Sequence, residues 1–287
     1  MSDTLRIGLP KGRMEAGVQQ LLSAAGIRVA PSARNYRPQI SLPLAEAKIQ
    51  KPQNVIEMLA IGRRDAGFAG ADWVAELGAE LVEVLDTELD PVQLVAAAPE
   101  SVMSEGRLPR RALVVASEYE NLTRRWMRAH ELDSSRFVRS YGATEVFPPE
   151  DADVIVDNSA TGATLRANGL VVVDRLLESS TRLYAAPQAW EQPSKRRRIE
   201  DLAVLLRSVM EARRRVMIEV NAPTDCLDSV VAVLPAMRQP TVSPLSGEGG
   251  FAIKAAVPRD QLPTLILALK AAGGSDIVVA PLSQIVP

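Results

Sequence analysis

The chain contains very little cysteine and histidine. One cysteine, Cys226, and one histidine, His130, occur among its 287 residues. A single cysteine excludes a disulfide within the chain, and this pair alone cannot supply the ligands of a Cys/His zinc site. Carboxylate side chains, of which the chain has many, still allow a magnesium site.

Long hydrophobic runs are also missing. No stretch approaches the roughly 20 apolar residues of a membrane helix. The segment "MSDTLRIGLPKGRM" has no long apolar run after its basic residues, unlike a secretory signal. The formal net charge of −2 argues against general binding to nucleic acid or to a membrane surface. We therefore expect a cytoplasmic protein without nucleic-acid or membrane partners.

Short apolar segments alternate with helical patterns through the first part of the chain. Each apolar segment has the length of a buried strand, and the segments between them show apolar residues at helical spacing. Alternation of this kind indicates α/β layers with largely parallel sheets. The expected strands cover residues 5–9, 65–70, 92–99, 112–117, 153–157 and 170–174, and the expected helices 14–25, 54–63 and 121–130.

The last part of the chain follows a different plan. After a break with two prolines, "PQAWEQPSKRRRIEDL", an amphipathic helix leads to a strand that starts at Val216. From there the order is β-α-β-β-α-β, the ferredoxin-like plan, with helices near 225–234 and 260–272. This segment has no obvious set of chemical groups, which suggests regulation or assembly. The basic run 195–198 is interpreted as a solvated helix start, because no aromatic residue is interleaved for nucleic-acid binding.

The stretch "DVIVDNSATGATLRANGL" has the pattern of a phosphate-binding junction. A strand ends at Asp157, a loop of small polar residues follows, and a helix begins near Thr164. Unpaired N–H groups at a helix start bind anions, and Gly162 lets the backbone approach a phosphate closely. Asp153 and Asp157 suit sugar hydroxyls or indirect metal contacts. The alternative is a plain strand-turn-helix junction capped by Ser159 or Thr161.

A second junction of this design lies in "GLPKGRM". Lys11 and Arg13 follow a strand directly and precede a helix, where they suit a pyrophosphate or triphosphate. A solvated basic pair is the alternative. Because α/β sheets bind ligands at the carboxyl ends of their strands, the two junctions together indicate one cleft for a phosphorylated sugar.

On these segments the chain resembles the ATP phosphoribosyltransferase family. "GATEVFPPEDADVIVDNSATGATLRANGL" is similar to the family's phosphoribosyl-pyrophosphate signature, and "LRIGLPKGRM" to its start. "KPQNVIEMLAIGRRDAGFAGAD", "ENLTRRWM" and "NAPTDCLDSVVAVLPAMRQPTVSPL" also fit, in order. The resemblance implies two periplasmic-binding-protein-like α/β lobes with a cleft between them, plus a C-terminal ferredoxin-like regulatory domain. Lobe I is expected at 1–92 with 183–211, lobe II at 93–182, and the regulatory domain at 212–287.

The resemblance also implies a reaction. N1 of the adenine of ATP attacks the anomeric carbon of phosphoribosyl pyrophosphate (PRPP), giving phosphoribosyl-ATP and pyrophosphate, the first step of histidine biosynthesis. Mg²⁺ on the pyrophosphate neutralises the leaving group. Histidine is the expected feedback inhibitor, and a homo-oligomer, a dimer or a hexamer, the expected assembly. A non-catalytic regulatory paralogue and a small-molecule sensor with the same fold remain alternatives.

The roles of single residues follow by matching positions to the family. By this match, Glu145 and Asp157 face the ribose or pyrophosphate. Lys11 and Arg13 face the polyphosphates. Lys51 and Asp72 lie near the nucleotide. Glu145 and Asp72 have alternative roles at helix starts, and Lys51 an alternative as a solvated cation. The loop that holds the 5′-phosphate consists of Ser159, Ala160, Thr161, Gly162, Ala163, Thr164 and Leu165.

Three positions depart from the family pattern, and three others concern the effector. Ala160, Ala69 and Lys51 replace the residues usual in the family, and lysine for arginine loses a bidentate phosphate contact. The resemblance assigns histidine binding to Asn221, Met237 and Thr241. Residue 221 is often aspartate in relatives, and an amide cannot pair with a charged imidazole. A core position for Met237 and a turn-stabilising hydroxyl for Thr241 are the alternatives.

Overall fold

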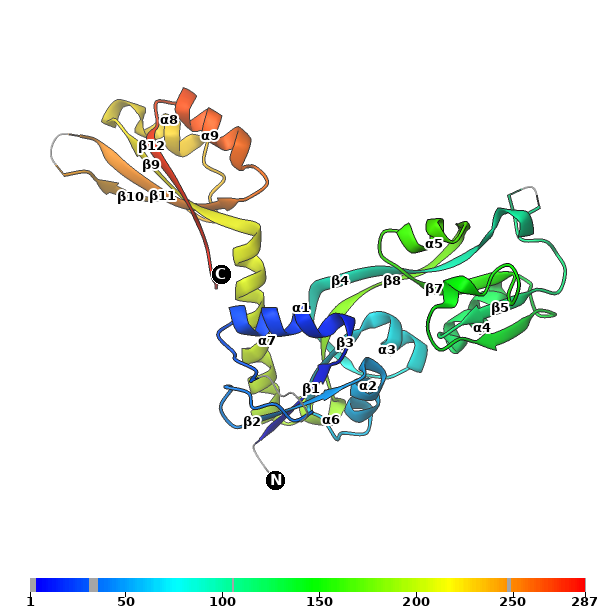
Figure 1. The fold of residues 1–287 in the computed structure, drawn as a ribbon. Helices are drawn as coiled ribbons and strands as arrows, with labels where there is room; N and C mark the ends of the chain where they lie inside the picture. Colours follow the sequence, from blue (N-terminus) through cyan, green and yellow to red (C-terminus); the bar gives the residue numbers. More distant parts are fainter. Residues whose placement is uncertain (1–3, 31–35, 105, 247–248, 287) are drawn as a thin grey trace. The chain divides into compact units, whose positions relative to one another are not determined.

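The computed structural model of the chain describes residues 4–30, 36–104, 106–246 and 249–286. The chain divides into two compact units, Met1–Ala203 and Val204–Pro287. The expected lobe II (93–182) lies in the first unit, as does the expected lobe I (1–92 with 183–211) except for residues 204–211. The expected regulatory domain (212–287) lies in the second unit (Figure 1).

The first unit alternates strands and helices as the sequence indicates. Its first half contains β1 (Leu5–Pro10), α1 (Arg13–Ala24), β2 (Ala45–Gln50), α2 (Pro52–Ala60), β3 (Ala66–Gly70), α3 (Ala71–Leu77), β4 (Val82–Pro99) and η1 (Glu100–Val102). Its second half contains β5 (Val114–Ser117), α4 (Glu120–Ala129), β6 (Arg136–Arg139), η2 (Thr144–Val146), β7 (Val154–Ser159), α5 (Ala163–Ala167), β8 (Leu170–Ala185) and α6 (Pro187–Trp190). Helix α7 (Pro193–Arg214) continues from the first unit into the second.

One eight-stranded sheet runs through both lobes of the first unit. Its strand order is β2-β1-β3-β8-β4-β7-β5-β6. The outer pairs, β1 with β2 and β3, and β5 with β6 and β7, are parallel as expected. The central pairs of β8 with β3 and β4, and of β4 with β7, are antiparallel, which corrects the expectation of a largely parallel sheet. The centre differs because the chain crosses between the lobes twice, in opposite directions, on β4 and β8 (Figure 1).

These two crossing strands are much longer than the sequence pattern predicts. β4 has 18 residues and β8 has 16, whereas the expected strands covered only 92–99 and 170–174. Their pairing is irregular between Asp86 and Val92, where Glu88 and Asp90 adopt left-handed backbone conformations with φ of 58° and 49°. The polar segment "DTELDP" in this region has no apolar alternation, so the sequence pattern did not predict a strand there.

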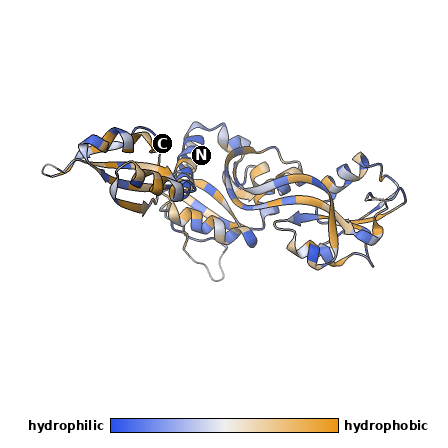
Figure 2. Cartoon of the chain, turned by 90° about the horizontal axis from the view of Figure 1, so that it is seen from above, coloured by the Kyte–Doolittle hydropathy of each residue, from blue (hydrophilic) through white to orange (hydrophobic). Residues whose placement is uncertain are grey.

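Burial along the ribbon of β4 and β8 is highest where helices cover it. In β4 the run from Leu94 to Ala98 is completely or almost completely buried. Leu94, Ala96 and Ala98 of this run share one core of the second lobe with Val115, Tyr119, Trp126 and Val156. Figure 2 shows hydrophobic and hydrophilic segments alternating along the long strands of this unit.

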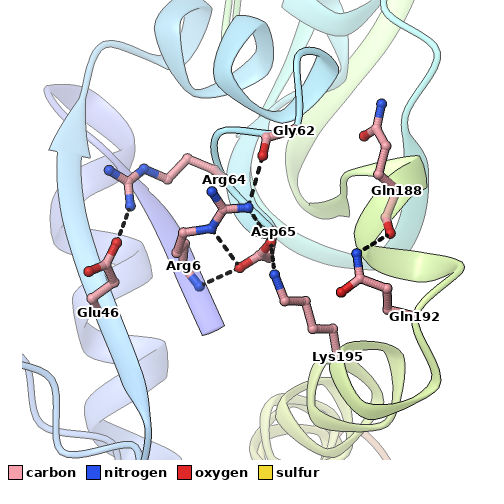
Figure 3. A network of polar contacts seen from close by, with 8 residues as sticks. All are labelled: Arg6, Glu46, Gly62, Arg64, Asp65, Gln188, Gln192 and Lys195. Carbon is pink, nitrogen blue, oxygen red and sulfur yellow. Dashed lines mark hydrogen bonds and ion pairs between the residues drawn. The ribbon is translucent and has the colours of Figure 1, made fainter. Parts of the chain in front are cut away.

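A buried carboxylate connects three elements of the first lobe (Figure 3). Asp65 accepts hydrogen bonds from Arg6 of β1, at 3.0 and 2.7 Å, and from Lys195 of α7, at 2.8 Å. Lys195 is 8% exposed, so the expectation of a solvated run at 195–198 is wrong for this residue. Burial raises the pKa of Asp65, but the hydrogen bonds from Arg6 and Lys195 outweigh it and leave the pKa below its usual value.

The second unit has the predicted β-α-β-β-α-β order. It contains β9 (Arg215–Ala222), η3 (Thr224–Cys226), α8 (Leu227–Ala232), β10 (Thr241–Pro244), β11 (Phe251–Pro258), α9 (Leu262–Ala271) and β12 (Ser275–Pro281). The sheet order β10-β11-β9-β12 is fully antiparallel, which confirms the ferredoxin-like plan. Val216, Ile218 and Val220 point from β9 into the core, where they meet Val230 and Leu265. None of the helices in the described ranges is long and apolar enough to span a membrane.

The Asp65 network predicts a large stability effect at one position. Asp65→Asn leaves the buried ammonium of Lys195 without its counter-charge, which costs about 3 kcal/mol of unfolding free energy. Because the folded-state pKa of Asp65 is lowered, its contribution is present at neutral pH and is lost as pH falls through that lowered value. Urea unfolding of the full chain at pH 7 measures the effect.

A matched control is available on the same sheet. Glu46 pairs with Arg64 at 3.0 Å, but its side chain is 55% exposed. Glu46→Gln should therefore cost less than about 1 kcal/mol. Equal losses from the two substitutions would contradict the structural role given to Asp65.

Candidate functional site

A cavity of about 380 Å³ lies at the end of β7, between the loop that follows this strand and the start of α1. It brings together the two junctions that the sequence singles out. Arg13 comes from the first lobe, and the other lining residues come from the second. The lining consists of Arg13, Glu118, Gly142, Ala143, Thr144, Glu145, Asp157, Asn158, Ser159, Ala160, Thr161, Gly162, Ala163, Thr164 and Leu165.

The loop after β7 forms one wall of this cavity. Gly162 has a φ of 71°, in the left-handed region, and a Cβ at this position would lie 2.8 Å from Nη1 of Arg166. The N–H of Gly162 donates to Oγ of Ser159 at 3.1 Å, and that of Ala163 to Oγ1 of Thr161 at 3.4 Å. Each hydroxyl thus accepts from the loop and keeps its own proton to donate. Helix α5 has only five residues, so the loop amides and hydroxyls, more than a helix dipole, suit this wall to an anion.

Three carboxylates also line the cavity. Asp157 ends the buried part of β7, Glu145 lies in η2, and Glu118 follows β5. Burial raises the pKa of Asp157 to about 6; the N–H of Asn158 and the hydroxyl of Thr144 oppose this shift, and the charges of Glu118 and Glu145 add to it. Among the described residues, no group of three or more metal-ligating side chains could hold an ion by itself. Glu118, Glu145 and Asp157 form an acidic wall of the same cavity as the loop.

A chain of hydrogen bonds runs from the cavity into the protein interior. Nη1 of Arg13 donates to Oδ1 of Asn158 at 3.3 Å, and Nδ2 of Asn158 donates to the hydroxyl of Tyr119 at 3.0 Å. The Tyr119 hydroxyl donates to Oδ2 of Asp72 at 2.6 Å, and Oγ of Ser179 donates to Oδ1 of Asp72 at 2.7 Å. Asp72 is 2% exposed, so the carboxylate expected near a nucleotide is buried behind Tyr119 in this structure.

The remaining predicted substrate residues lie outside this cavity. Lys11 is exposed at the end of β1, where its ammonium donates to the hydroxyl of Tyr36 at 3.0 Å and lies 4.8 Å from the centre of that ring. Lys51 is exposed directly before α2. Asp153 precedes β7, at the end of the strand away from the loop, and pairs with Arg111 at 2.7 Å. The structure therefore does not bring Asp153 to the cavity, because a six-residue strand separates the two.

Sequence reasoning missed three residues of the site region. Asn158 lies inside the phosphate-type motif, but roles were predicted only for its carboxylate neighbour Asp157 and for the hydroxyl residues of the loop. Tyr119 and Glu118 follow β5 in "SEYEN", where nothing in the sequence connects them with a loop some 40 residues later. The one available signal was position, since both follow the carboxyl end of a predicted buried strand.

The three predicted effector residues lie on or beside the sheet of the second unit. Asn221 near the end of β9 donates through Nδ2 to Oδ2 of Asp276 on β12 at 3.2 Å. Thr241 begins β10, whose residues are all exposed. The N–H of Met237 donates to the carbonyl of Ala256 at 3.3 Å, and its side chain is half-buried.

Comparison with known families covers both units of the chain. The family model described as ATP phosphoribosyltransferase matches residues 51–208, and the model described as HisG, C-terminal domain, matches residues 212–284. The first match spans more than half of the chain.

Relatives and a solved structure agree with these matches. The chain is 36% identical to the ATP phosphoribosyltransferase of Pelotomaculum thermopropionicum and 38% identical to that of Desulforudis audaxviator, in each case over 99% of both chains. A chain of the ATP phosphoribosyl transferase (HisG:HisZ) complex from Thermotoga maritima shares the fold, with a TM-score of 0.63 and 23% identity. That alignment covers 71% of this chain and 97% of the other. On the family match and the full-length relatives, the chain belongs to the ATP phosphoribosyltransferase family, which catalyses the first step of histidine biosynthesis.

Proposed function

We propose that the cavity at the end of β7 is the PRPP site of this transferase. The observation that carries the proposal is that two kinds of wall line one cavity: a loop of amides and hydroxyls, and the carboxylates Glu118, Glu145 and Asp157. A phosphosugar presents a phosphate to the first wall and hydroxyl groups to the second. The loop from Ser159 to Leu165 binds the 5′-phosphate, and Asp157 and Glu145 accept hydrogen bonds from the ribose.

The same carboxylates suit the transition state of the transfer. The bond from the anomeric carbon to the pyrophosphate breaks, and pyrophosphate leaves with the electron pair. N1 of the adenine of ATP supplies the pair for the new bond, which gives phosphoribosyl-ATP. The ribose becomes positively charged during the exchange, and fixed negative charge nearby stabilises it. Arg13 and Lys11 contact the polyphosphates, and Lys51 belongs to the nucleotide side. Asp72 is buried behind Tyr119 and does not contact the nucleotide directly.

The cavity also fits a magnesium ion brought in by the substrate. Its carboxylates are hard oxygen donors, and burial together with their mutual repulsion raises the pKa of Asp157. A pyrophosphate close to this acidic wall needs a counter-ion, and Mg²⁺ typically uses one or two carboxylates together with substrate phosphates. When bound, Mg²⁺ neutralises charge on the leaving pyrophosphate. We assign the contact with this ion to Glu145 and Asp157.

For the second unit we propose histidine binding and feedback inhibition. The amide of Asn221 cannot form an ion pair with a charged imidazole. It donates a hydrogen bond to Asp276, and this neighbouring carboxylate can supply the negative charge. Asp276 is exposed and has a φ of 47°, a conformation that costs energy for a residue with a side chain. Met237 and Thr241 complete the proposed effector residues. From the family resemblance we also propose a cytoplasmic homo-oligomer, with a hexamer as the expected form.

An assay of variants at the cavity tests the proposed site. Arg13→Ala removes a cation, and Gly162→Val places a branched side chain where the backbone is left-handed and Arg166 is already close. Both should lower turnover by a factor of about 100 or more, since substrate positioning contributes several kcal/mol to catalysis. The measurement is the formation of phosphoribosyl-ATP from ATP, PRPP and Mg²⁺, followed spectrophotometrically with pyrophosphatase present.

The control for this assay is Arg125→Ala, which removes an exposed arginine of α4. It should leave turnover unchanged. Near-normal turnover in both cavity variants would overturn the assignment. A wild-type chain without turnover that still binds histidine would instead point to a regulatory paralogue.

Asp157 should show opposite effects on stability and activity. Its raised pKa means that the folded state disfavours its charge; this cost is absent below the usual pKa of 3.8, appears as pH rises, and is complete above about 6. Asp157→Asn should therefore stabilise the fold at pH 8 by on the order of 1 kcal/mol, allowing for partial exposure. The gain should be smaller at pH 5, and turnover should fall sharply at both values.

Thermal unfolding of wild type and variant at pH 5 and pH 8 gives the comparison. Ser159→Ala, which removes a hydroxyl from the same loop without changing a carboxylate, controls for general effects of substitution. A variant that is less stable than wild type at pH 8 would contradict the electrostatic account.

The regulatory proposal predicts a loss of inhibition without a loss of catalysis. Asp276→Asn and Thr241→Ala should each raise the histidine concentration for half-inhibition about tenfold or more, since a charged hydrogen bond contributes about 1.5–3 kcal/mol. Uninhibited turnover should stay near that of wild type. Asp228→Asn, at an exposed position of α8, is the control for charge removal on this unit. Unchanged inhibition in both variants would place the effector elsewhere.

A further inference from the structure

We propose that Tyr119 and Asp72 form a positioning pair that fixes the side-chain amide of Asn158, so that its carbonyl oxygen faces Arg13. The inference rests on the proposed role of the cavity and of Arg13. It adds a function for two buried residues that do not line the cavity.

The direction of each hydrogen bond carries the argument. A carboxylate only accepts, so the single proton of the Tyr119 hydroxyl is committed to Oδ2 of Asp72, at 2.6 Å. The hydroxyl can then only accept from Asn158. The NH₂ group of Asn158 must turn inward, at 3.0 Å from the Tyr119 oxygen. Its carbonyl oxygen is left facing outward, 3.3 Å from Nη1 of Arg13.

The outward oxygen matches what Arg13 needs. A guanidinium group has donors and no acceptor, so it binds a carbonyl oxygen and is repelled by an NH₂ group. With the amide reversed, the NH₂ group of Asn158 would face the guanidinium of Arg13, donor against donor. Its carbonyl oxygen would face the oxygen of Tyr119, acceptor against acceptor. The pair in the interior thus selects one of two amide orientations that have nearly the same shape.

The pair is held rigidly enough for this role. Tyr119 is fully buried and Asp72 is 2% exposed. Trp73 packs against Tyr119 with ring centres 4.6 Å apart, and Ser179 donates to the second oxygen of Asp72 at 2.7 Å. Burial and the neighbouring Asp72 raise the pKa of Tyr119, so its hydroxyl keeps the proton at neutral pH. Asp72 lies in α3 and Ser179 on β8, and the pair joins both to Asn158 near the end of β7.

A double-mutant cycle between Tyr119 and Arg13 tests the proposal. Tyr119→Phe keeps the ring and removes the hydroxyl, so Asn158 is free to rotate. We expect the KM for PRPP to rise about tenfold, and kcat to change by less. Starting from Arg13→Ala, the same substitution should have little further effect, because the oriented oxygen has lost its partner. Tyr184→Phe, which removes another buried hydroxyl on β8, is the control and should leave the KM for PRPP unchanged.

A second readout does not depend on turnover. PRPP with Mg²⁺ should raise the melting temperature of the wild-type chain, and this shift should shrink in Tyr119→Phe and remain in Tyr184→Phe. If Tyr119→Phe does not fold, Asn158→Ala replaces it in the cycle with Arg13→Ala, since Asn158 is half-buried at the cavity. In that cycle, too, the two effects should not multiply.

The outcomes separate this inference from the proposed function. A normal KM for PRPP in Arg13→Ala would overturn both the role of Arg13 and the positioning pair. An impaired Arg13→Ala with a normal Tyr119→Phe would overturn the positioning pair alone. Effects of the two substitutions that multiply would do the same, because independent sites give additive free energies.

Discussion

The antiparallel pairing of β4 with β8 is the constraint on which the first unit depends. These strands are the only part of the described sheet that belongs to both lobes, and their pairing joins the two lobes in one sheet. Arg13 and Asn158 of β7 are 145 residues apart in the chain and still share a hydrogen bond. The irregular pairing near Glu88 and Asp90 lies within this ribbon, where Thr87 and Thr181 supply hydrogen bonds that the ladder lacks.

The site combines groups that are unfavourable to assemble without a ligand. Glu118, Glu145 and Asp157 repel one another, and the raised pKa of Asp157 reflects that repulsion together with burial. In the same cavity, Gly162 adopts a left-handed backbone conformation that places the loop amides beside the carboxylates. The proposed substrate, with a phosphate, hydroxyl groups and an attached cation, would bind the loop and relieve this repulsion at once. Unfavourable electrostatic interactions of this kind are typical of binding sites, where side chains are arranged for a ligand and not for the stability of the fold.

Much of the fold could be predicted because local patterns determined it. The strand before Asp157, the amphipathic helices and the ferredoxin-like order all follow from short-range periodicity. The ends of β4 and β8 could not be predicted, since "DTELDP" is a strand only because it pairs with a partner nearly 100 residues away. At the site, the phosphate-type loop and Arg13 followed from motif chemistry. The positions of Tyr119 and Glu118 near the site depend on tertiary contacts that the sequence does not reveal. Asp153 was predicted at the site because it is acidic and close to the motif, but the structure puts it at the other end of β7.

Lys195 also determines how short a folded version of the first unit can be. A fragment that stopped at the end of β8 would contain every strand of the large sheet, yet it would bury Asp65 with Arg6 as its only cation. The basic side chain that completes this charge balance comes from a helix that continues into the second unit. A fragment of the first unit that folds by itself should therefore extend beyond residue 195, so that Lys195 can neutralise the buried carboxylate of Asp65.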